Sequence, residues 1–303
     1  MKATMATRIR RKDKLVFNTV GYILVFLFGI MCILPFYLVV IASFTSEASL
    51  MKNGFSLYIT NFSLDAYRFS FNNPERIFWA YRNTICVTII GTALSTLMAM
   101  MTGYVLQRKD MPGRNGLSFF FFFTVLFNGG LVPTYIINTR YFGFKNQYYA
   151  LILPLMFSVW NMIIAKSYMK GLPYEITESA KVDGANDLVI FFKLILPLCK
   201  PLIATLGLFS ALTYWNDWYN SLLYITDDTK ISLQYFLHEM LSGIEALKLI
   251  ASRGGTESLS SVTLPQETMK MAMTIIVTGP IIFLYPFVQK YFVKGLTLGA
   301  VKG

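Results

Sequence analysis

Long stretches without a single charged residue are the strongest constraint on how this chain can fold. After Lys14 no charged side chain occurs until Glu47, and this apolar run is too long for a signal-peptide core of about 7–15 residues. A helix needs about 20 apolar residues to cross the hydrocarbon core of a bilayer. The pattern predicts an all-α polytopic membrane protein with six transmembrane helices, at about residues 15–44, 83–107, 115–139, 146–169, 201–224 and 271–293.

The composition restricts the kind of site that the chain can hold. Charged residues make up 14% of the sequence and the mean hydropathy is +0.52, whereas soluble domains carry about 25% charged residues. The net charge of +11 fits basic loops beside membrane spans, so we predict no nucleic-acid partner. The three cysteines lie in apolar segments without metal-ligand spacing, and His238 is the single histidine. Since the G-x4-G-K-[ST] phosphate loop is also missing, we expect no catalytic residue, metal or cofactor in this chain.

Basic residues predict the orientation in the membrane. More than half of the 27 Lys and Arg residues lie in the N-terminal tail, in residues 107–116 and 166–200, and from Lys290 onward. Loops rich in Lys and Arg remain on the cytoplasmic side. We therefore expect both termini in the cytoplasm, as tails of residues 1–14 and 294–303, together with a cytoplasmic loop over residues 170–200.

That loop contains a helical signal that begins at Pro173. Proline suits the first position of a helix because its φ is already helical and its missing N–H would have been unpaired there. Ile176, Ala180 and Val182 give a short apolar stripe. The helix should end at Asp183-Gly184, because glycine tolerates the left-handed conformation of a helix C-terminus.

A second helix is expected directly after the glycine. Asn186 or Asp187 can cap it, and it should run into Leu194-Ile195-Leu196 before Pro197 breaks it. The predicted result is helix, glycine corner and helix over residues 173–197, which we call the elbow. It would form a rigid connection between two membrane spans.

The elbow resembles the "EAA" loop of ABC importer permeases, whose pattern is E-A-A-x3-G-x9-I-x-L-P. The spacings agree throughout, while Ser179 replaces an alanine and Leu194 an isoleucine. In that family the loop is cytoplasmic and docks into a groove on an ATP-hydrolysing subunit, so the resemblance implies a coupling role. The implied coupling residues are Glu178, Ser179, Ala180, Asp183, Gly184, Ala185, Leu196 and Pro197.

The residue types agree with such docking. Ser179 and Ala180 are small and allow close approach, Glu178 can meet a basic or amide donor, and Gly184 sets the bend. The alternative is an ordinary cytoplasmic helical hairpin between two spans.

One span contains a cluster of polar and aromatic residues. An acidic residue inside a span is costly, so Asp217 should face the bundle interior or a wet cavity. Amide and carboxylate groups can hydrogen-bond sugar hydroxyls, and aromatic rings can stack on a sugar ring. The alternative is an interfacial aromatic belt in which the carboxylate caps a helix break. The candidate pathway residues are Trp215, Asn216, Asp217, Trp218 and Tyr219, with Asn161 in the fourth span as a weaker candidate or an interhelical hydrogen bond.

Outside the elbow, the chain resembles the permeases of carbohydrate importers. The ending over 293–303 is similar to that of the smaller permease subunit of maltose-type importers. The stretches over 128–135 and 215–218 are similar to those of permeases for complex oligosaccharides, of the aldouronate and polysaccharide-lyase-linked type. The resemblance implies a multi-pass protein of the bacterial inner or plasma membrane, in a heterodimer with a second permease. It also implies two ATP-binding subunits, which use ATP and Mg²⁺, and an extracytoplasmic sugar-binding protein.

Three other functions compete with a sugar importer. An ion-coupled secondary carrier would need ionisable groups deep in several spans, and Asp217 alone qualifies. A membrane-embedded glycosyl or acyl transferase would need His, Asp or Glu clustered at one membrane face, which the sequence lacks. An ABC importer for a non-sugar solute is the third alternative, and only the resemblance to carbohydrate permeases argues against it. The amphipathic segment over 231–250 has two possible roles. It could be a helix on the outer membrane surface, or it could contact the binding protein.

Overall fold

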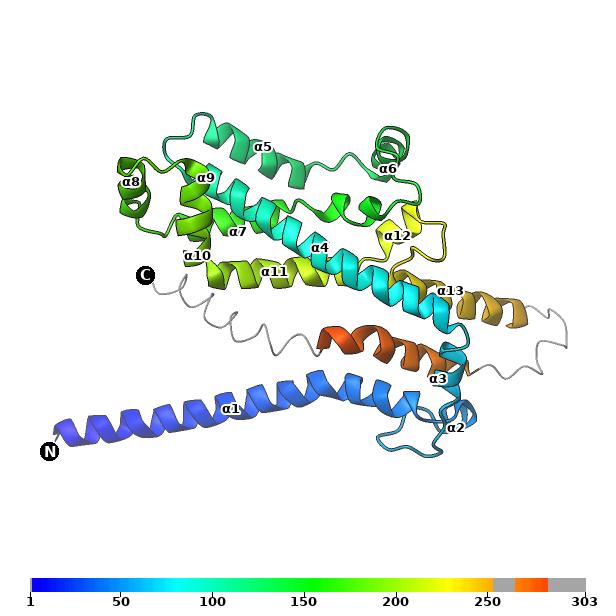
Figure 1. Cartoon of the computed structure of the whole chain (residues 1–303). Coiled ribbons are helices and arrows are strands. Elements are labelled where there is room, and N and C mark those ends of the chain that lie inside the picture. Colours follow the sequence, from blue (N-terminus) through cyan, green and yellow to red (C-terminus); the bar gives the residue numbers. More distant parts are fainter. Residues whose placement is uncertain (1, 253–264, 283–303) are drawn as a thin grey trace. The chain divides into compact units, whose positions relative to one another are not determined.

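The computed structural model describes residues 2–252 and 265–282 (Figure 1). Within these ranges the chain forms helices and loops, with one isolated β-bridge and no strand. The described residues divide into two compact units, one within Met1–Asn72 and Leu247–Ile276 and the other within Asn73–Ala246 and Val277–Gly303. In chain order the elements are α1 (Lys2–Ser43), α2 (Glu47–Asn53), α3 (Asp65–Ser70), α4 (Pro74–Gln107), α5 (Arg114–Leu126), α6 (Leu131–Arg140), the 3₁₀ turns η1 (Tyr148–Leu151) and η2 (Leu153–Leu155), α7 (Val159–Met169), α8 (Glu175–Val182), α9 (Asp187–Val189), the π-helical η3 (Ile190–Ile195), α10 (Leu196–Leu198), α11 (Lys200–Trp215), α12 (Tyr219–Tyr224) and α13 (Leu233–Ser252).

The first unit is built around the apolar helix α1. Within Asp13–Ser43, an apolar window of 18 residues has a mean hydropathy of 2.8 and contains no buried residue, as expected for a helix surrounded by lipid. A further helix covers residues 266–282. The carboxylate of Glu47 accepts hydrogen bonds from the backbone N–H groups of Glu267 (3.0 Å) and Thr268 (2.9 Å) at the start of this helix. A negative charge is favourable there because the first N–H groups of a helix have no partner inside it.

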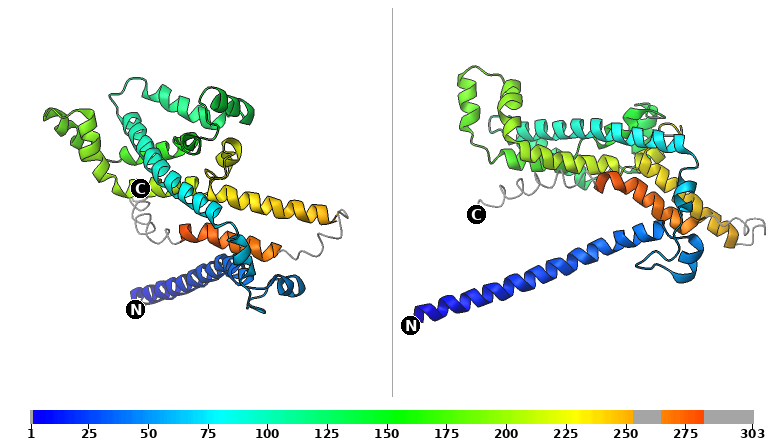
Figure 2. Two further views of the ribbon diagram at one scale, coloured as in Figure 1. Left: turned by 45° about the vertical axis from the view of Figure 1, so that its right-hand side comes forward. Right: turned by 60° about the horizontal axis from the view of Figure 1, so that its bottom comes forward.

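The second unit is organised around α4, which packs along both α7 and α11 (Figures 1 and 2). Close approach depends on two glycines of α4. A Cβ atom at Gly91 would lie 2.4 Å from the ring of Tyr214, and one at Gly103 would lie 2.7 Å from Cβ of Ala165. Small residues at such crossings let membrane helices pack backbone to backbone.

Three pairs of consecutive helices meet at a sharp bend. The pair α5 and α6 bends by 111°, residues 148–155 and α7 by 48°, and residues 187–198 and α11 by 86°. In the first pair Asn128 accepts the N–H of Gly130 at 2.9 Å, and Gly130 has a φ of 88°, a conformation that glycine adopts without strain. The predicted spans 115–139 and 146–169 each contain one of these bends, whereas the 86° bend lies at Cys199, before the predicted span 201–224, which is itself interrupted between α11 and α12.

The number of possible membrane crossings depends on how the bent pairs are counted. By length and composition, the stretch Asp13–Ser43 and α4 each suffice to cross a membrane, and counting each bent pair as one span gives up to five among the described residues. The second predicted span, 83–107, is contained in α4, which starts earlier at Pro74. The sixth, 271–293, begins inside the helix over 266–282, and its remainder lies outside the described residues, as does the predicted tail 294–303.

Candidate functional site: the elbow and the polar residues of the spans

The first arm of the elbow is α8, closed by a glycine turn. The N–H of Gly184 donates to Lys181 O (3.0 Å) and that of Ala185 to Ala180 O (2.9 Å), the paired hydrogen bonds of a Schellman motif. Gly184 has a φ of 77°, which confirms the predicted glycine corner. Pro173 precedes the N-cap residue of α8, so its predicted place at the first helical position is wrong by two residues.

The second arm starts as predicted and ends differently. The side chain of Asn186 accepts the N–H of Val189 at 2.8 Å and caps α9. The chain then widens into the π-helix η3, and Pro197 lies inside α10. The predicted break at Pro197 is therefore displaced to Cys199, the residue between α10 and α11. A proline has no N–H to donate to the preceding turn, and its ring clashes with that turn, so local rearrangement before it is expected.

The residues of α8 divide between a buried and an exposed face. Ala180 (7% exposed) and Thr177 (5%) face the core, which η3, α4, α7 and α11 also line. Glu178 and Ser179 are exposed. Val182, which the apolar stripe placed with Ala180, is 87% exposed, so that part of the prediction is wrong. The exposed face of α8 thus combines a carboxylate, a hydroxyl and one apolar side chain.

The other predicted coupling residues have different surroundings. Asp183 is the C-cap residue of α8 and is exposed, as is Gly184. Ala185 and Leu196 are half-buried against the same core, and Pro197 is exposed. The structure therefore brings Glu178, Ser179 and Asp183 to the surface of the first arm, while Ala180, Ala185 and Leu196 hold the elbow in place.

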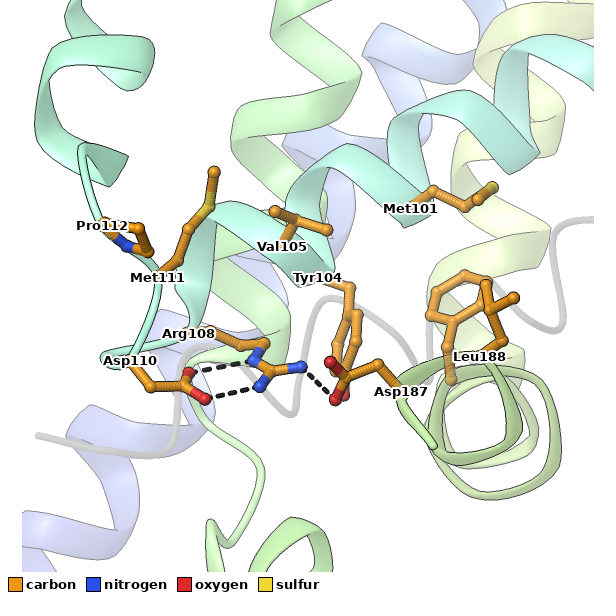
Figure 3. A pocket seen from close by; sticks show the side chains of 10 residues that line it. Met101, Tyr104, Val105, Arg108, Asp110, Met111, Pro112, Asp187 and Leu188 are labelled. Atoms are coloured by element: carbon orange, nitrogen blue, oxygen red, sulfur yellow. Dashed lines mark hydrogen bonds and ion pairs between the residues drawn. The ribbon is translucent and has the colours of Figure 1, made fainter. Parts of the chain in front are cut away.

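An ion cluster that the sequence analysis did not identify holds the elbow against the end of α4 (Figure 3). Arg108 pairs with Asp187 of the second arm and, through Nε at 2.9 Å, with Oδ1 of Asp110. Lys181 of the first arm reaches Oδ2 of Asp110 at 2.8 Å. Hydrogen bonds from Arg108 and Lys181 lower the pKa of Asp110 below its ordinary range, and Asp110 raises the pKa of both cations.

A cavity of about 310 Å³ lies beside this cluster. The ring of Tyr104 contacts that of Phe191 with centroids 5.4 Å apart, so α4 and η3 also touch through aromatic packing. The lining residues are Met101, Tyr104, Val105, Arg108, Asp110, Met111, Pro112, Asp187, Leu188 and Phe191 (Figure 3).

The first two residues of the predicted pathway cluster point in different directions. Trp215 is 6% exposed, and its Nε1–H donates to the carbonyl of Val277 at 3.2 Å. Asn216 is exposed, donates to Leu212 O at 2.9 Å and accepts from Gln234 at 3.1 Å. The indole of Trp215 is thus covered by protein and presents no free face for a sugar ring.

The remaining three residues lie at the break between α11 and α12. Asp217 accepts the backbone N–H of Asn220 at 3.2 Å and its side-chain amide at 3.0 Å, which is a helix-capping arrangement. Trp218 stacks on the ring of His238 with centroids 4.2 Å apart. Trp218 and Tyr219 remain 37% and 42% exposed. Asp217 therefore caps the start of α12, as the alternative interpretation of this cluster predicts.

Asn161 belongs to a separate polar chain inside the bundle. It is 5% exposed and donates to Ser210 Oγ at 3.2 Å, and Ser210 donates to Ser95 Oγ at 3.2 Å. These side chains come from α7, α11 and α4. They line a cavity of about 430 Å³, together with Pro154, Leu155, Phe157, Ser158, Trp160, Phe209, Thr213 and Tyr214. In the described ranges no group of three or more His, Cys, Asp or Glu residues is placed to hold a metal ion.

Comparison with known proteins connects the whole chain to sugar transporters. It is 40% identical to the polygalacturonan/rhamnogalacturonan transport system permease protein YtcP of Bacillus subtilis, over 95% of this chain and 98% of that protein. It is 38% identical to the protein LplC of the same organism, over 91% of each chain. No family model matches the chain.

A solved structure agrees in fold as well. The chain aligns with the crystal structure of a bacterial ABC transporter involved in the import of the acidic polysaccharide alginate, with a TM-score of 0.78 and 27% identity. The alignment covers 91% of this chain and 96% of that one. The helical architecture, the near-complete coverage and the 40% identity together identify the chain as a member of the permease subunits of ABC sugar transporters.

Proposed function

We propose that this chain forms half of the translocation pathway of an ATP-driven oligosaccharide importer and that its elbow docks on the ATPase subunits. The elbow geometry is the observation that carries this proposal. One face of α8 is anchored in the core through Thr177 and Ala180, while Glu178 and Ser179 are exposed on the other. A short helix held this way can transmit a push from a docked partner, because the packed core behind it deforms little.

The proposed assembly contains this chain, a second permease, two ATP-binding subunits and an extracytoplasmic sugar-binding protein. ATP and Mg²⁺ would bind to the ATP-binding subunits. The relatives support this composition because they are permeases of transport systems, and the alginate transporter is an importer. ATP binding would close the ATPase pair, and the elbow would carry the movement into the spans to alternate their access.

The proposed topology has six spans, both termini and the elbow in the cytoplasm of a bacterial cell, and one permease domain over residues 15–293 between two short tails. The distribution of Lys and Arg supports it. The bent pairs α5 with α6 and 148–155 with α7 would each count as one crossing, and so would α11 with α12, since irregular backbone at membrane depth is tolerated where protein or a wet cavity surrounds it.

Two of the relatives support a proposal for the substrate class. Polygalacturonan and alginate are both chains of uronic acids, so we propose an acidic oligosaccharide. The cavity beside Asn161 is the best-supported contact, because it combines buried polar groups with the rings of Trp160 and Tyr214. Trp218 and Tyr219 would contribute at the outer end through their exposed rings, while Trp215, Asn216 and Asp217 would shape that end.

Purification through a tag on this chain, after co-expression with candidate partner subunits, tests the proposal. We expect an ATPase to co-purify, and its turnover to rise when a binding protein loaded with oligogalacturonate is added. Unloaded binding protein is the control. If the chain purifies alone and transports sugar into vesicles without ATP, the elbow has no coupling role and an ion-coupled carrier becomes the better account.

A further inference from the structure

Each end of α4 carries an arginine that is bound by two carboxylates from other segments. Arg76 lies in the first turn and Arg108 directly follows the last residue of the helix. The helix between them is unbroken over 34 residues, about 50 Å at a rise of 1.5 Å per residue. It is therefore long enough to connect the two faces of a membrane.

At the first end, Nη2 of Arg76 lies 2.7 Å from Oδ1 of Asp228 and 2.7 Å from Oε2 of Glu239. Its guanidinium carbon is 5.5 Å from the ring centre of Phe236. Glu239 and Phe236 belong to α13. The helix dipole disfavours a cation in the first turn of a helix. The two ion pairs and the contact with the Phe236 ring must therefore stabilise Arg76 at this position.

A second set of hydrogen bonds strengthens the same connection. The amide of Asn83 donates to the carbonyls of Thr229 (2.8 Å) and Ile231 (3.2 Å), and the N–H of Leu233 donates to Thr84 Oγ1 at 2.8 Å. Asn83 and Thr84 are buried. The segment 228–239 is thus attached to the first three turns of α4 through polar contacts.

At the second end, Arg108 joins Asp110 and the elbow residue Asp187, and Lys181 joins Asp110 to the first arm. The Arg108 side chain is 12% exposed, so its ion pairs are less screened than those on an open surface. Between the ends, the contacts at Gly91 and Gly103 leave little room for α4 to bend.

We propose that α4 is a strut between the elbow and segment 228–239, and that Arg108 and Arg76 are positioning residues that clamp its two ends. The proposal rests on the proposed function, in which the elbow faces the ATPase and segment 228–239 faces the outside. A movement of the elbow would then shift α4 along its length and move the outer helix α13. The same path would carry the signal of a docked binding protein inward.

The test reads the outer end while the ATPase end is switched. Ser242 is an exposed residue of α13, so Ser242→Cys reports on that helix through its rate of maleimide labelling. The native cysteines are removed by Cys32→Ser, Cys86→Ser and Cys199→Ala, so that only position 242 is labelled. The complex with this cysteine-free chain must retain its ATPase activity. The complex in lipid nanodiscs is compared with and without ATP, Mg²⁺ and orthovanadate, which trap the closed ATPase.

We expect trapping to change the labelling rate in the parent chain, and Arg76→Gln or Arg108→Gln to reduce that change at least about fivefold, the low end of usual allosteric coupling. Lys109→Gln and Arg82→Gln are the matched controls and should retain it. Lys109 is exposed beside Arg108, and Arg82 lies over the ring of Trp79, at 4.9 Å, on the same helix. The exchange Arg76→Glu with Glu239→Arg should restore part of the response.

The outcomes separate the two proposals. If no ATPase co-purifies, or trapping leaves the parent chain unchanged, the proposed function fails. If the ATPase co-purifies and trapping alters the parent chain, but either arginine variant responds like the parent, the strut is overturned. Variants that lose the labelling response while the ATPase still co-purifies support the strut, because a folding defect would also prevent co-purification.

Discussion

The elbow and the stretch over 215–219 were both identified in the sequence, and they behave differently in the structure. In the elbow, Gly184 and Asn186 occupy the turn and cap positions that their chemistry predicts. In the other stretch, Trp215 is buried and Asp217 caps a helix, so the cluster does not form one binding surface. Local backbone chemistry could be predicted from neighbouring residues, whereas the direction of a side chain depends on helices far away in the sequence.

Substitutions in the first arm should have the largest effect on this comparison. Gly184→Val forces a β-branched residue into a φ of 77°, at a cost of about 1–2 kcal/mol or a rearranged elbow. Glu178→Lys reverses an exposed charge without that strain. We expect both variants to remain in the membrane and to lose most sugar uptake, measured in vesicles alongside ATPase turnover. Gly116→Ala, a helical position with open space around it, is the control. Normal uptake in both variants would remove the elbow from the coupling path.

The parts that could not be predicted share a physical cause. Arg108 and Asp187 are 79 residues apart, so nothing in the local sequence indicates their ion pair. Val182 is 87% exposed although the prediction grouped it with Ala180, because a residue two positions further along a helix lies about 200° around its axis, away from the buried face. Hydropathy does not predict the bend at Asn128–Gly130, because it reflects the apolar length of a segment and carries no information on backbone direction. The local sequence predicts that the helices of the elbow exist and which residues cap them. The bends between helices and the ion pairs between distant residues can be identified only in the folded structure.

The pathway residues offer the next contrast. Asn161→Leu removes a buried amide beside a cavity. We expect sugar transport to fall about tenfold, because that factor corresponds to the free energy of roughly one lost hydrogen bond. Asp217→Asn retains an acceptor for Asn220 and should leave transport within about twofold of the parent, because a cap contributes only about 1 kcal/mol. Initial uptake rates at saturating and limiting sugar measure both. The reverse order of effects would place the sugar contact at Asp217.

A smaller effect is expected from the cap of the second arm. Asn186→Ala removes the acceptor for the N–H of Val189 and should destabilise the elbow by about 1 kcal/mol. Asn186→Asp retains an acceptor and should be nearly neutral. Limited proteolysis of the purified complex measures this, with faster cleavage near residue 186 expected only for the alanine variant. Equal cleavage in both variants would show that the cap does not hold the arm.

The smallest effect concerns pH at the ion cluster. Because the pKa of Asp110 is lowered in the folded protein, its contribution to stability is full above its ordinary value near 4 and is lost as the pH falls through the lowered value. The difference in thermal midpoint between the parent and Asp110→Asn should therefore be constant between about pH 5 and 8. It should become smaller below about pH 4. A difference that changes between pH 6 and 8 would mean that another group controls the cluster.

Protection of the elbow in the assembled transporter tests the central claim most directly. Ser179→Cys places a reactive thiol on the exposed face of α8, and Ser242→Cys places a comparable thiol on α13 as the control. Docking predicts that the thiol at position 179 reacts with maleimide in the chain purified without ATPase subunits and is protected when they are bound. The thiol at position 242 should react in both states. Equal labelling of position 179 with and without the ATPase subunits would contradict the account.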